Sequence, residues 1–168
     1  MSRIRFATVW LDGCSGCHMS FLDMDMILLD LAEKIDLVYS PLVDFKIFPE
    51  NVDVTVVEGA VSSVEDEEKI KHIRSRTKTL IALGDCAVTS NVPGMRNVFS
   101  VDDIMEYVYG DEPPVKVIPP LLEKSVPVHH VVPVDVFITG CPPSADTIVK
   151  ALLAVLEGKP NPVPPRFG

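Results

Sequence analysis

The sequence predicts a single α/β domain built on a parallel, doubly wound sheet. Short segments rich in β-branched and apolar residues alternate along the chain with longer helix-forming segments, a pattern typical of parallel strands joined by crossover helices. One strand segment, 52–61, is apolar almost without interruption, which suits a strand covered on both faces. With 168 residues, the chain is long enough to bury a sizeable core.

Five strands are expected, at 4–10, 36–40, 52–61, 78–84 and 134–140. Residues 18–34 are strong helix formers, so one helix is predicted there, apolar on most sides. In the segment 62–77, Ser62 stands three residues before Glu65, the spacing of a capping box, and the segment ends in bases. We expect an exposed crossover helix from it. The last helix is predicted over 143–157, with Pro143 at its first position and Gly158 at its close.

Two proline-rich segments break this alternation. Residues 111–133 contain six prolines, and the C-terminal segment 159–168 contains four. The first cannot supply a central strand or a long helix, and the second should be extended. We therefore expect one domain over 1–158, with a proline-rich insertion at about 111–133, and an extended tail over 159–168. Each segment is either a loop or frayed end, or a stretch that lies along a neighbouring subunit.

Composition limits the classes of function. The net charge is −9, with 24 acidic and 15 basic residues, and the basic residues do not cluster, so no nucleic-acid surface is expected. Hydrophobic residues make up 47% of the chain, yet no apolar run reaches the roughly 18 residues of a membrane span. The surplus apolar surface therefore predicts a partner protein. Nothing near the N-terminus resembles an export signal, so a cytoplasmic location and reduced thiols are expected.

Each cysteine follows a predicted strand. Cys14 and Cys17 follow the strand at 4–10, Cys86 follows 78–84, and Cys141 follows 134–140. Because ligands of an open parallel sheet bind beyond the carboxyl ends of its strands, all four cysteines could serve one site. Glycine beside a ligand lets backbone N–H groups turn towards a thiolate or sulfide. Such glycines stand at positions 13, 16, 84 and 140.

Three kinds of site remain open from the spacing alone. The C-x2-C pair could be a thiol redox pair, but that interpretation leaves Cys86 and Cys141 without a role. Structural zinc usually takes two paired knuckles, whereas this chain has one pair and two single cysteines. An iron–sulfur cluster takes four thiolates, and a Cys-Pro step such as Cys141-Pro142 recurs at its ligands. Thiolate chemistry alone does not separate zinc from iron and sulfide.

Four motifs resemble the small subunit of [NiFe]-hydrogenases. They are "WLDGCSGCHMSF" at 10–21, "VVEGAV" at 56–61, "ALGDCAVTSNVPGMRN" at 82–97 and "GCPPS" at 140–144. Their order and spacing match over residues 4 to about 157. The resemblance implies a flavodoxin-like fold and a proximal [4Fe–4S] cluster in this domain. By the same resemblance, the cluster ligands are Cys14, Cys17, Cys86 and Cys141.

The resemblance also implies partners. The nickel–iron centre would lie in a separate large subunit, and this chain would pass electrons between that centre and a diaphorase module, where NAD is reduced. Because no twin-arginine leader and no second cysteine-rich domain are recognised, the chain resembles the short, cytoplasmic, NAD-reducing (bidirectional) type. FMN could also bind a flavodoxin-like sheet, but no glycine-rich phosphate loop supports it beyond fold analogy.

Two alternatives to this function remain open. In the related cluster-binding subunit of respiratory complex I, the first two ligands are adjacent cysteines, whereas Ser15 and Gly16 separate them here. That departure favours a hydrogenase. The second alternative is an α/β scaffold protein that is held together by a structural zinc ion and only binds partners. Such a protein would be colourless.

Glu58 and Asp85 are further candidate site residues. The resemblance places Glu58 near the large-subunit interface, on a possible proton route. Alternatively, its carboxylate receives the N–H groups of the helix that begins near Ser62. Asp85, beside Cys86, is expected to hydrogen-bond loop backbone.

Overall fold

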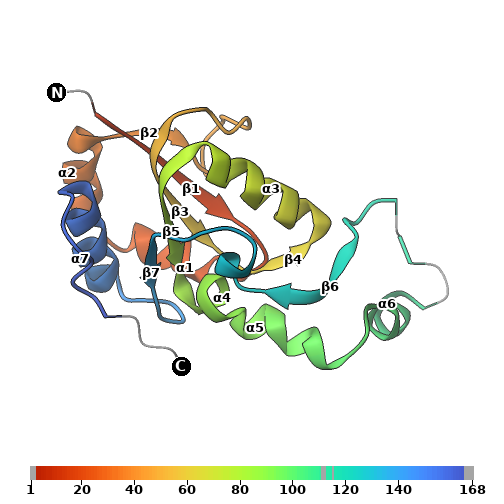
Figure 1. The fold of residues 1–168 in the computed structure, drawn as a ribbon. Coiled ribbons are helices and arrows are strands. Elements are labelled where there is room, and N and C mark those ends of the chain that lie inside the picture. Colours follow the sequence, from red (N-terminus) through yellow and green to blue (C-terminus); the bar gives the residue numbers. More distant parts are fainter. Residues whose placement is uncertain (1–2, 111–112, 115, 165–168) are drawn as a thin grey trace.

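A five-stranded parallel sheet forms the centre of the molecule (Figure 1). The structure is a computed structural model and describes residues 3–110, 113–114 and 116–164. The strand order is β2-β1-β3-β5-β7, which is the flavodoxin-like order and confirms the predicted fold class. The strands are β1 (Ile4–Trp10), β2 (Ile35–Tyr39), β3 (Val52–Glu58), β5 (Thr77–Leu83) and β7 (Val136–Ile138).

Helices cover both faces of this sheet (Figure 1). Successive residues of a strand point to opposite faces, so Val57 of β3 shares a core with Ile70 of α3 (Val64–Ser75). Its neighbour Val56 shares the other core with Leu31 of α2 (Ile27–Lys34) and Ile148 of α7 (Ala145–Leu156). The near-continuous apolar character of segment 52–61 thus reflects burial on both sides.

A smaller lobe extends from the sheet, to the right in Figure 1. It contains an antiparallel pair of strands, β4 (Val61–Ser63) and β6 (Leu121–Val126). As expected, the described part of the insertion at 111–133 adds no strand to the five-stranded sheet; residues 111, 112 and 115 lie outside the described residues. The remaining helices are α1 (Gly16–Leu22), α4 (Gly84–Thr89), α5 (Asn91–Gly94), η1 (Met95–Val98), α6 (Val101–Tyr109) and η2 (Val128–His130).

The prediction of one helix over 18–34 was wrong. The segment forms two helices, α1 and α2, and Asp25 between them has a φ of 50°. Aspartate tolerates this left-handed conformation better than most residues. The turn buries Met24 in the core cluster on that face of the sheet, so packing rather than helix propensity decides the break.

Two helix starts also differ from the sequence prediction. The capping box of α3 uses Ser63 and Asp66, one residue later than Ser62 and Glu65, because β4 extends through Ser63 and the helix begins at Val64. At α7 the N-cap is Ser144, whose hydroxyl accepts the backbone N–H of Thr147, so Pro143 precedes the helix. The tail folds back at Asn161, whose amide donates to the Phe137 carbonyl at 3.1 Å. Residues 165–168 of the predicted tail lie outside the described residues.

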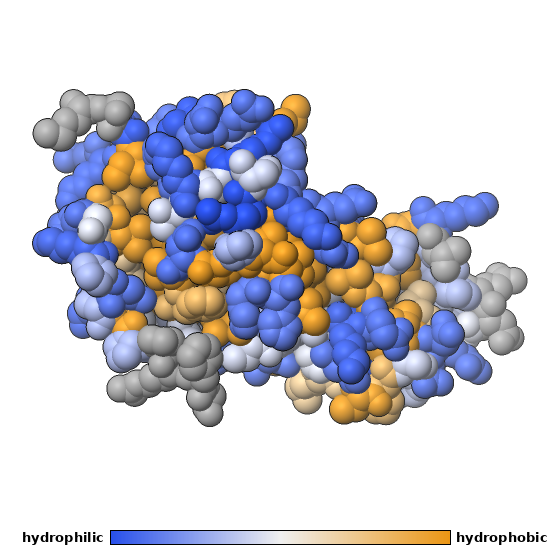
Figure 2. Space-filling model, viewed as in Figure 1, coloured by the Kyte–Doolittle hydropathy of each residue, from blue (hydrophilic) through white to orange (hydrophobic). Residues whose placement is uncertain are grey.

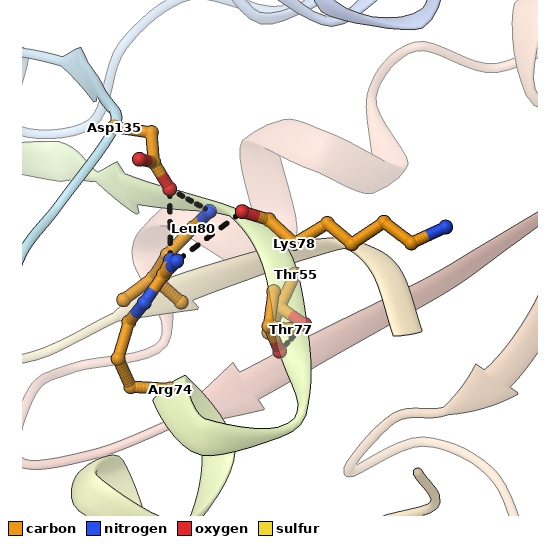
Figure 3. Close-up of polar contacts among 6 residues, drawn as sticks. All are labelled: Thr55, Arg74, Thr77, Lys78, Leu80 and Asp135. Carbon is orange, nitrogen blue, oxygen red and sulfur yellow. Dashed lines mark hydrogen bonds and ion pairs between the residues drawn. The ribbon is translucent and has the colours of Figure 1, made fainter. Parts of the chain in front are cut away.

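Asp135 attaches the short edge strand β7 to the sheet and to α3 (Figure 3). Its Oδ2 accepts hydrogen bonds from the Leu80 backbone N–H at 2.7 Å and from Arg74 Nη1 at 2.8 Å. The same guanidinium donates to the Lys78 carbonyl at 3.2 Å. These bonds fix the start of the strand that leads into the Cys141 loop.

Candidate functional site

Three loops that carry cysteines meet at the carboxyl edge of the sheet. Cys17 lies in α1 after β1, Cys86 lies in α4 after β5, and Cys141 follows β7. All four cysteines are free thiols; Cys14 and Cys141 are exposed, while Cys17 and Cys86 are partly buried. The site is therefore open to solvent, or to a partner, on the side of the two exposed thiols.

Gly84 marks the point where the loops touch. A Cβ atom added to Gly84 would lie 2.1 Å from Cys17 Sγ and 3.4 Å from the Gly140 carbonyl oxygen. Gly84 also has a φ of +81°, a backbone conformation that residues other than glycine rarely adopt. Only glycine therefore allows the β1 loop and the β7 loop to approach the start of α4 so closely.

Asp85 joins the Cys86 loop to the Cys141 loop. Its Oδ1 accepts the Gly140 backbone N–H at 2.7 Å, and its own backbone N–H donates to the Gly140 carbonyl at 2.9 Å. The prediction that Asp85 holds loop backbone is confirmed. Since Gly140 directly precedes Cys141, this pair of bonds sets the distance between two of the candidate ligand loops.

The thiols lie near enough to influence one another electrostatically. Burial raises the pKa of the Cys17 thiol well above its ordinary value, and the charges of Glu58 and of the other three cysteines raise it further. Burial also raises the pKa of Cys86, which a hydrogen bond from the Val92 backbone opposes. Several thiolates gathered in one partly buried place repel each other, so positive charge from metal would stabilise the deprotonated set.

The kind and number of the donors fit an iron–sulfur cluster. Four thiols from three loops match the ligand set of such clusters, and glycines keep Cβ atoms away from them, as at Gly84 and at Gly16, where a Cβ would lie 3.2 Å from Cys14 Sγ. Within the described part of the chain, no group of three or more histidine, cysteine, aspartate or glutamate residues is placed so that it could hold a metal ion.

Glu58 lies buried beside the first cysteine loop, with 3% of its surface exposed. Its Oε2 accepts the backbone N–H of His18 at 2.8 Å. The imidazole Nδ1 of His18 lies 3.1 Å from the same oxygen but is not directed for a hydrogen bond. Glu58 thus accepts a backbone N–H from the first turn of α1, and the alternative that it serves the helix near Ser62 was wrong, since Asp66 fills that role.

The comparisons with known proteins agree on one family. The sequence model of the family described as "NADH ubiquinone oxidoreductase, 20 Kd subunit" matches residues 14–155. This chain belongs to that family. The match begins at the first candidate ligand and includes all four cysteines.

Two relatives of this chain are hydrogenase subunits. It is 43% identical to "NAD-reducing hydrogenase HoxS subunit delta" of Cupriavidus necator, over 96% of this chain and 83% of the relative. It is 37% identical to a subunit of the F420-non-reducing hydrogenase of Methanococcus voltae, over 98% of this chain but only 60% of the relative. The chain thus spans about three fifths of that longer relative.

Solved structures give the same assignment of the fold. A chain of a crystal structure of an NAD+-reducing [NiFe]-hydrogenase in the H2-reduced state superimposes with a TM-score of 0.92 and 37% identity, covering 97% of this chain and 96% of that one. A [NiFeSe]-hydrogenase chain from Desulfomicrobium baculatum has a TM-score of 0.62 at 19% identity, and shares the fold. No helix in the described part of the chain has the length and apolar character needed to cross a membrane.

Sequence reasoning missed one contact of this site. The side-chain amide of Asn91 donates to Cys141 Sγ at 3.4 Å. Asn91 stands within the motif at 82–97, and asparagine is a common residue at positive φ, but its contact depends on a turn formed between two helices. No local pattern indicates where that turn directs the amide.

Proposed function

We propose that this chain is the electron-transfer small subunit of a cytoplasmic, NAD-reducing [NiFe]-hydrogenase. The observation that carries the proposal is the meeting of three cysteine-bearing loops at Gly84, in a chain 43% identical to a subunit of an NAD-reducing hydrogenase. The nearly complete mutual coverage with a chain of an NAD+-reducing [NiFe]-hydrogenase supports it. The location follows from the reaction, since NAD is reduced in the cytoplasm.

The proposed ligands of a [4Fe–4S] cluster are Cys14, Cys17, Cys86 and Cys141. A relative from Archaeoglobus profundus, 28% identical, is named an iron-sulfur subunit, which supports iron and sulfide over zinc. When bound, the cluster would carry single electrons between a nickel–iron centre in the large subunit and the clusters of a diaphorase module. This chain's own part is to supply the thiolates and nearby N–H groups and to limit water at the site, which together set the reduction potential.

Exposed apolar side chains support the proposed partners. Figure 2 shows apolar surface over several parts of the visible face rather than at a single spot. In the α1–α2 segment, Met19 and Met26 are 61% and 67% exposed. In the smaller lobe, Phe99 and Tyr107 are 60% and 92% exposed. Exposed large apolar side chains in separate regions fit a subunit held between a large subunit and diaphorase subunits.

Glu58 is proposed to lie on a proton route. It is a buried carboxylate within electrostatic range of Cys17, at the edge where the large subunit would dock. The alternative role, support of the α1 N-terminus through the His18 N–H, is compatible with proton transfer, because one oxygen can accept that bond while the other exchanges a proton. Buried ionisable groups at such positions are candidates for function.

The test of the proposed function is the purified complex of this chain with its partner subunits. We expect nickel in the large subunit, iron and acid-labile sulfide in this chain, a broad absorption band near 400 nm and an EPR signal on reduction. The Cys86→Ala variant should lose hydrogen-driven NAD reduction while the nickel content is retained. A colourless chain that contains zinc would contradict the cluster, and a complex without nickel would favour the complex I alternative.

A further inference from the structure

The turn formed by Ser90 and Asn91, the first residue of α5, presents a side-chain N–H group to one of the candidate ligands. Ser90 and Asn91 have φ angles of 66° and 22°, so two successive residues other than glycine are left-handed. The Asn91 side-chain amide donates to Cys141 Sγ at 3.4 Å. This turn directly follows the helix that carries Cys86, and it contacts the sulfur of the Cys141 loop.

A buried hydroxyl network holds this turn in its unusual conformation. Ser90 is 4% exposed, and its hydroxyl bonds to the Ser125 hydroxyl at 2.8 Å. Ser125 also accepts a hydrogen bond from the Ser62 hydroxyl at 2.7 Å, which brings in β4 as well as β6. The Asn97 side chain completes the attachment, because it donates to the Ser125 carbonyl and accepts the Ser125 backbone N–H, both at 2.8 Å.

This hydroxyl network links the smaller lobe to the turn whose Asn91 amide contacts the Cys141 sulfur. Left-handed backbone at a residue other than glycine is unfavourable, so it persists only where surrounding contacts require it. Here β4 and β6 supply those contacts through Ser62 and Ser125. The strands outside the main sheet therefore help to fix the Asn91 amide, together with the Ser90 backbone N–H, which donates to the Cys86 carbonyl at 3.0 Å.

We propose that Asn91 is a tuning residue, whose amide N–H to the Cys141 sulfur raises the reduction potential of the cluster. This inference rests on the proposed function. Reduction adds one electron, and hence negative charge, at the sulfurs. An N–H dipole directed at a sulfur stabilises that added charge and so favours the reduced state.

The test compares Asn91→Gly and Asn91→Asp with the unchanged complex in an EPR-monitored redox titration with dithionite as reductant. Glycine adopts positive φ freely, so the first variant removes the donor without adding backbone strain. Aspartate keeps the shape but replaces the donor by a negative charge. We expect a more negative midpoint potential in Asn91→Gly and a still more negative one in Asn91→Asp. The signal lost in Cys86→Ala identifies the cluster being titrated.

Asn51→Gly is the matched control. Asn51 also has a positive φ, 58°, but it precedes β3 at the opposite end of the sheet, so its variant should titrate like the unchanged complex. An unmoved potential in Asn91→Gly, with the cluster signal present, overturns this inference alone. Absence of any cluster signal from the unchanged complex overturns the proposed function, and the inference with it. The two failures are therefore distinct.

Discussion

Glu58 accepts the backbone N–H of His18 at 2.8 Å, so the end of β3 supports the helix that begins beside Cys17. Both residues are 3% exposed, and a buried N–H without a partner would cost about 1–3 kcal/mol. The carboxylate therefore contributes to the shape of the first cysteine loop, whatever else it does.

Glu58→Gln separates structural support from proton transfer. Glutamine keeps an oxygen that can accept the His18 N–H, so the melting temperature should change little. Its amide does not exchange a proton as a carboxyl group does, so hydrogen-driven NAD reduction should fall about tenfold or more, where each factor of ten corresponds to about 1.4 kcal/mol of barrier. Glu58→Ala should lose about 1–3 kcal/mol of stability in addition. Undiminished turnover in Glu58→Gln would remove Glu58 from the proton route.

Gly84→Ala should prevent assembly of the metal site. The added Cβ would lie 2.1 Å from Cys17 Sγ, so Cys17 or the start of α4 must move. We expect a large loss of iron and acid-labile sulfide, measured per purified chain. The matched control is Gly158→Ala, since Gly158 also has a positive φ, 67°, but nothing lies within 4 Å of its added Cβ. That variant should lose only about 1–2 kcal/mol from backbone strain and keep its iron.

The main sheet could be predicted from the sequence because its strands are runs of apolar, β-branched residues. The sequence placed β1, β3 and β5 to within a few residues, and it assigned the cysteines to the ends of strands. From there, the parallel topology itself predicts that the loops meet at one edge. The break at Asp25 could not be predicted, because residues on both sides favour helix and the burial of Met24 is a tertiary effect.

The smaller lobe could not be predicted for a different reason. Strand β4 has only three residues, and its partner β6 carries the exposed charges Glu123 and Lys124 within a proline-rich segment. Neither strand shows the alternation of apolar and polar residues that indicates a sheet. A long stretch of chain also separates the two strands that pair. The Ser62–Ser125 contact and the direction of the Asn91 amide follow from that pairing, so they remained hidden as well.

Ser125→Ala tests how much the smaller lobe contributes to stability. The Ser125 hydroxyl contacts the hydroxyls of both Ser62 and Ser90, and its loss leaves buried partners with one bond fewer. We expect a loss of about 1–3 kcal/mol in the free energy of unfolding, measured by urea denaturation. The control is Ser75→Ala, whose exposed hydroxyl bonds only to the His72 carbonyl among the described contacts, and which should change stability by less than about 0.5 kcal/mol. Equal stabilities of the two variants would contradict a structural role for the network.

Asp53 gives a pH-dependent contribution to stability whose sign follows from its contacts. A hydrogen bond from Lys78, at 2.6 Å, is the largest cause that lowers the pKa of Asp53, and the Arg5 backbone N–H at 2.9 Å lowers it further. A carboxyl group with a lowered folded-state pKa stabilises the protein above its unfolded value of about 3.9, and loses that contribution as the pH falls through the folded value.

Asp53→Asn should therefore destabilise the protein at neutral pH and lose this effect in acid. Because the Lys78 side chain is 72% exposed, we expect a difference of only about 0.2–1 kcal/mol at pH 7. The difference should be constant down to about pH 4 and shrink below it. Lys78→Gln and the double variant complete a double-mutant cycle that isolates the pair. A stability difference between Asp53→Asn and the unchanged protein that grew as the pH fell below 4 would contradict the assigned direction of the pKa shift, because protonation of Asp53 must remove its advantage over asparagine.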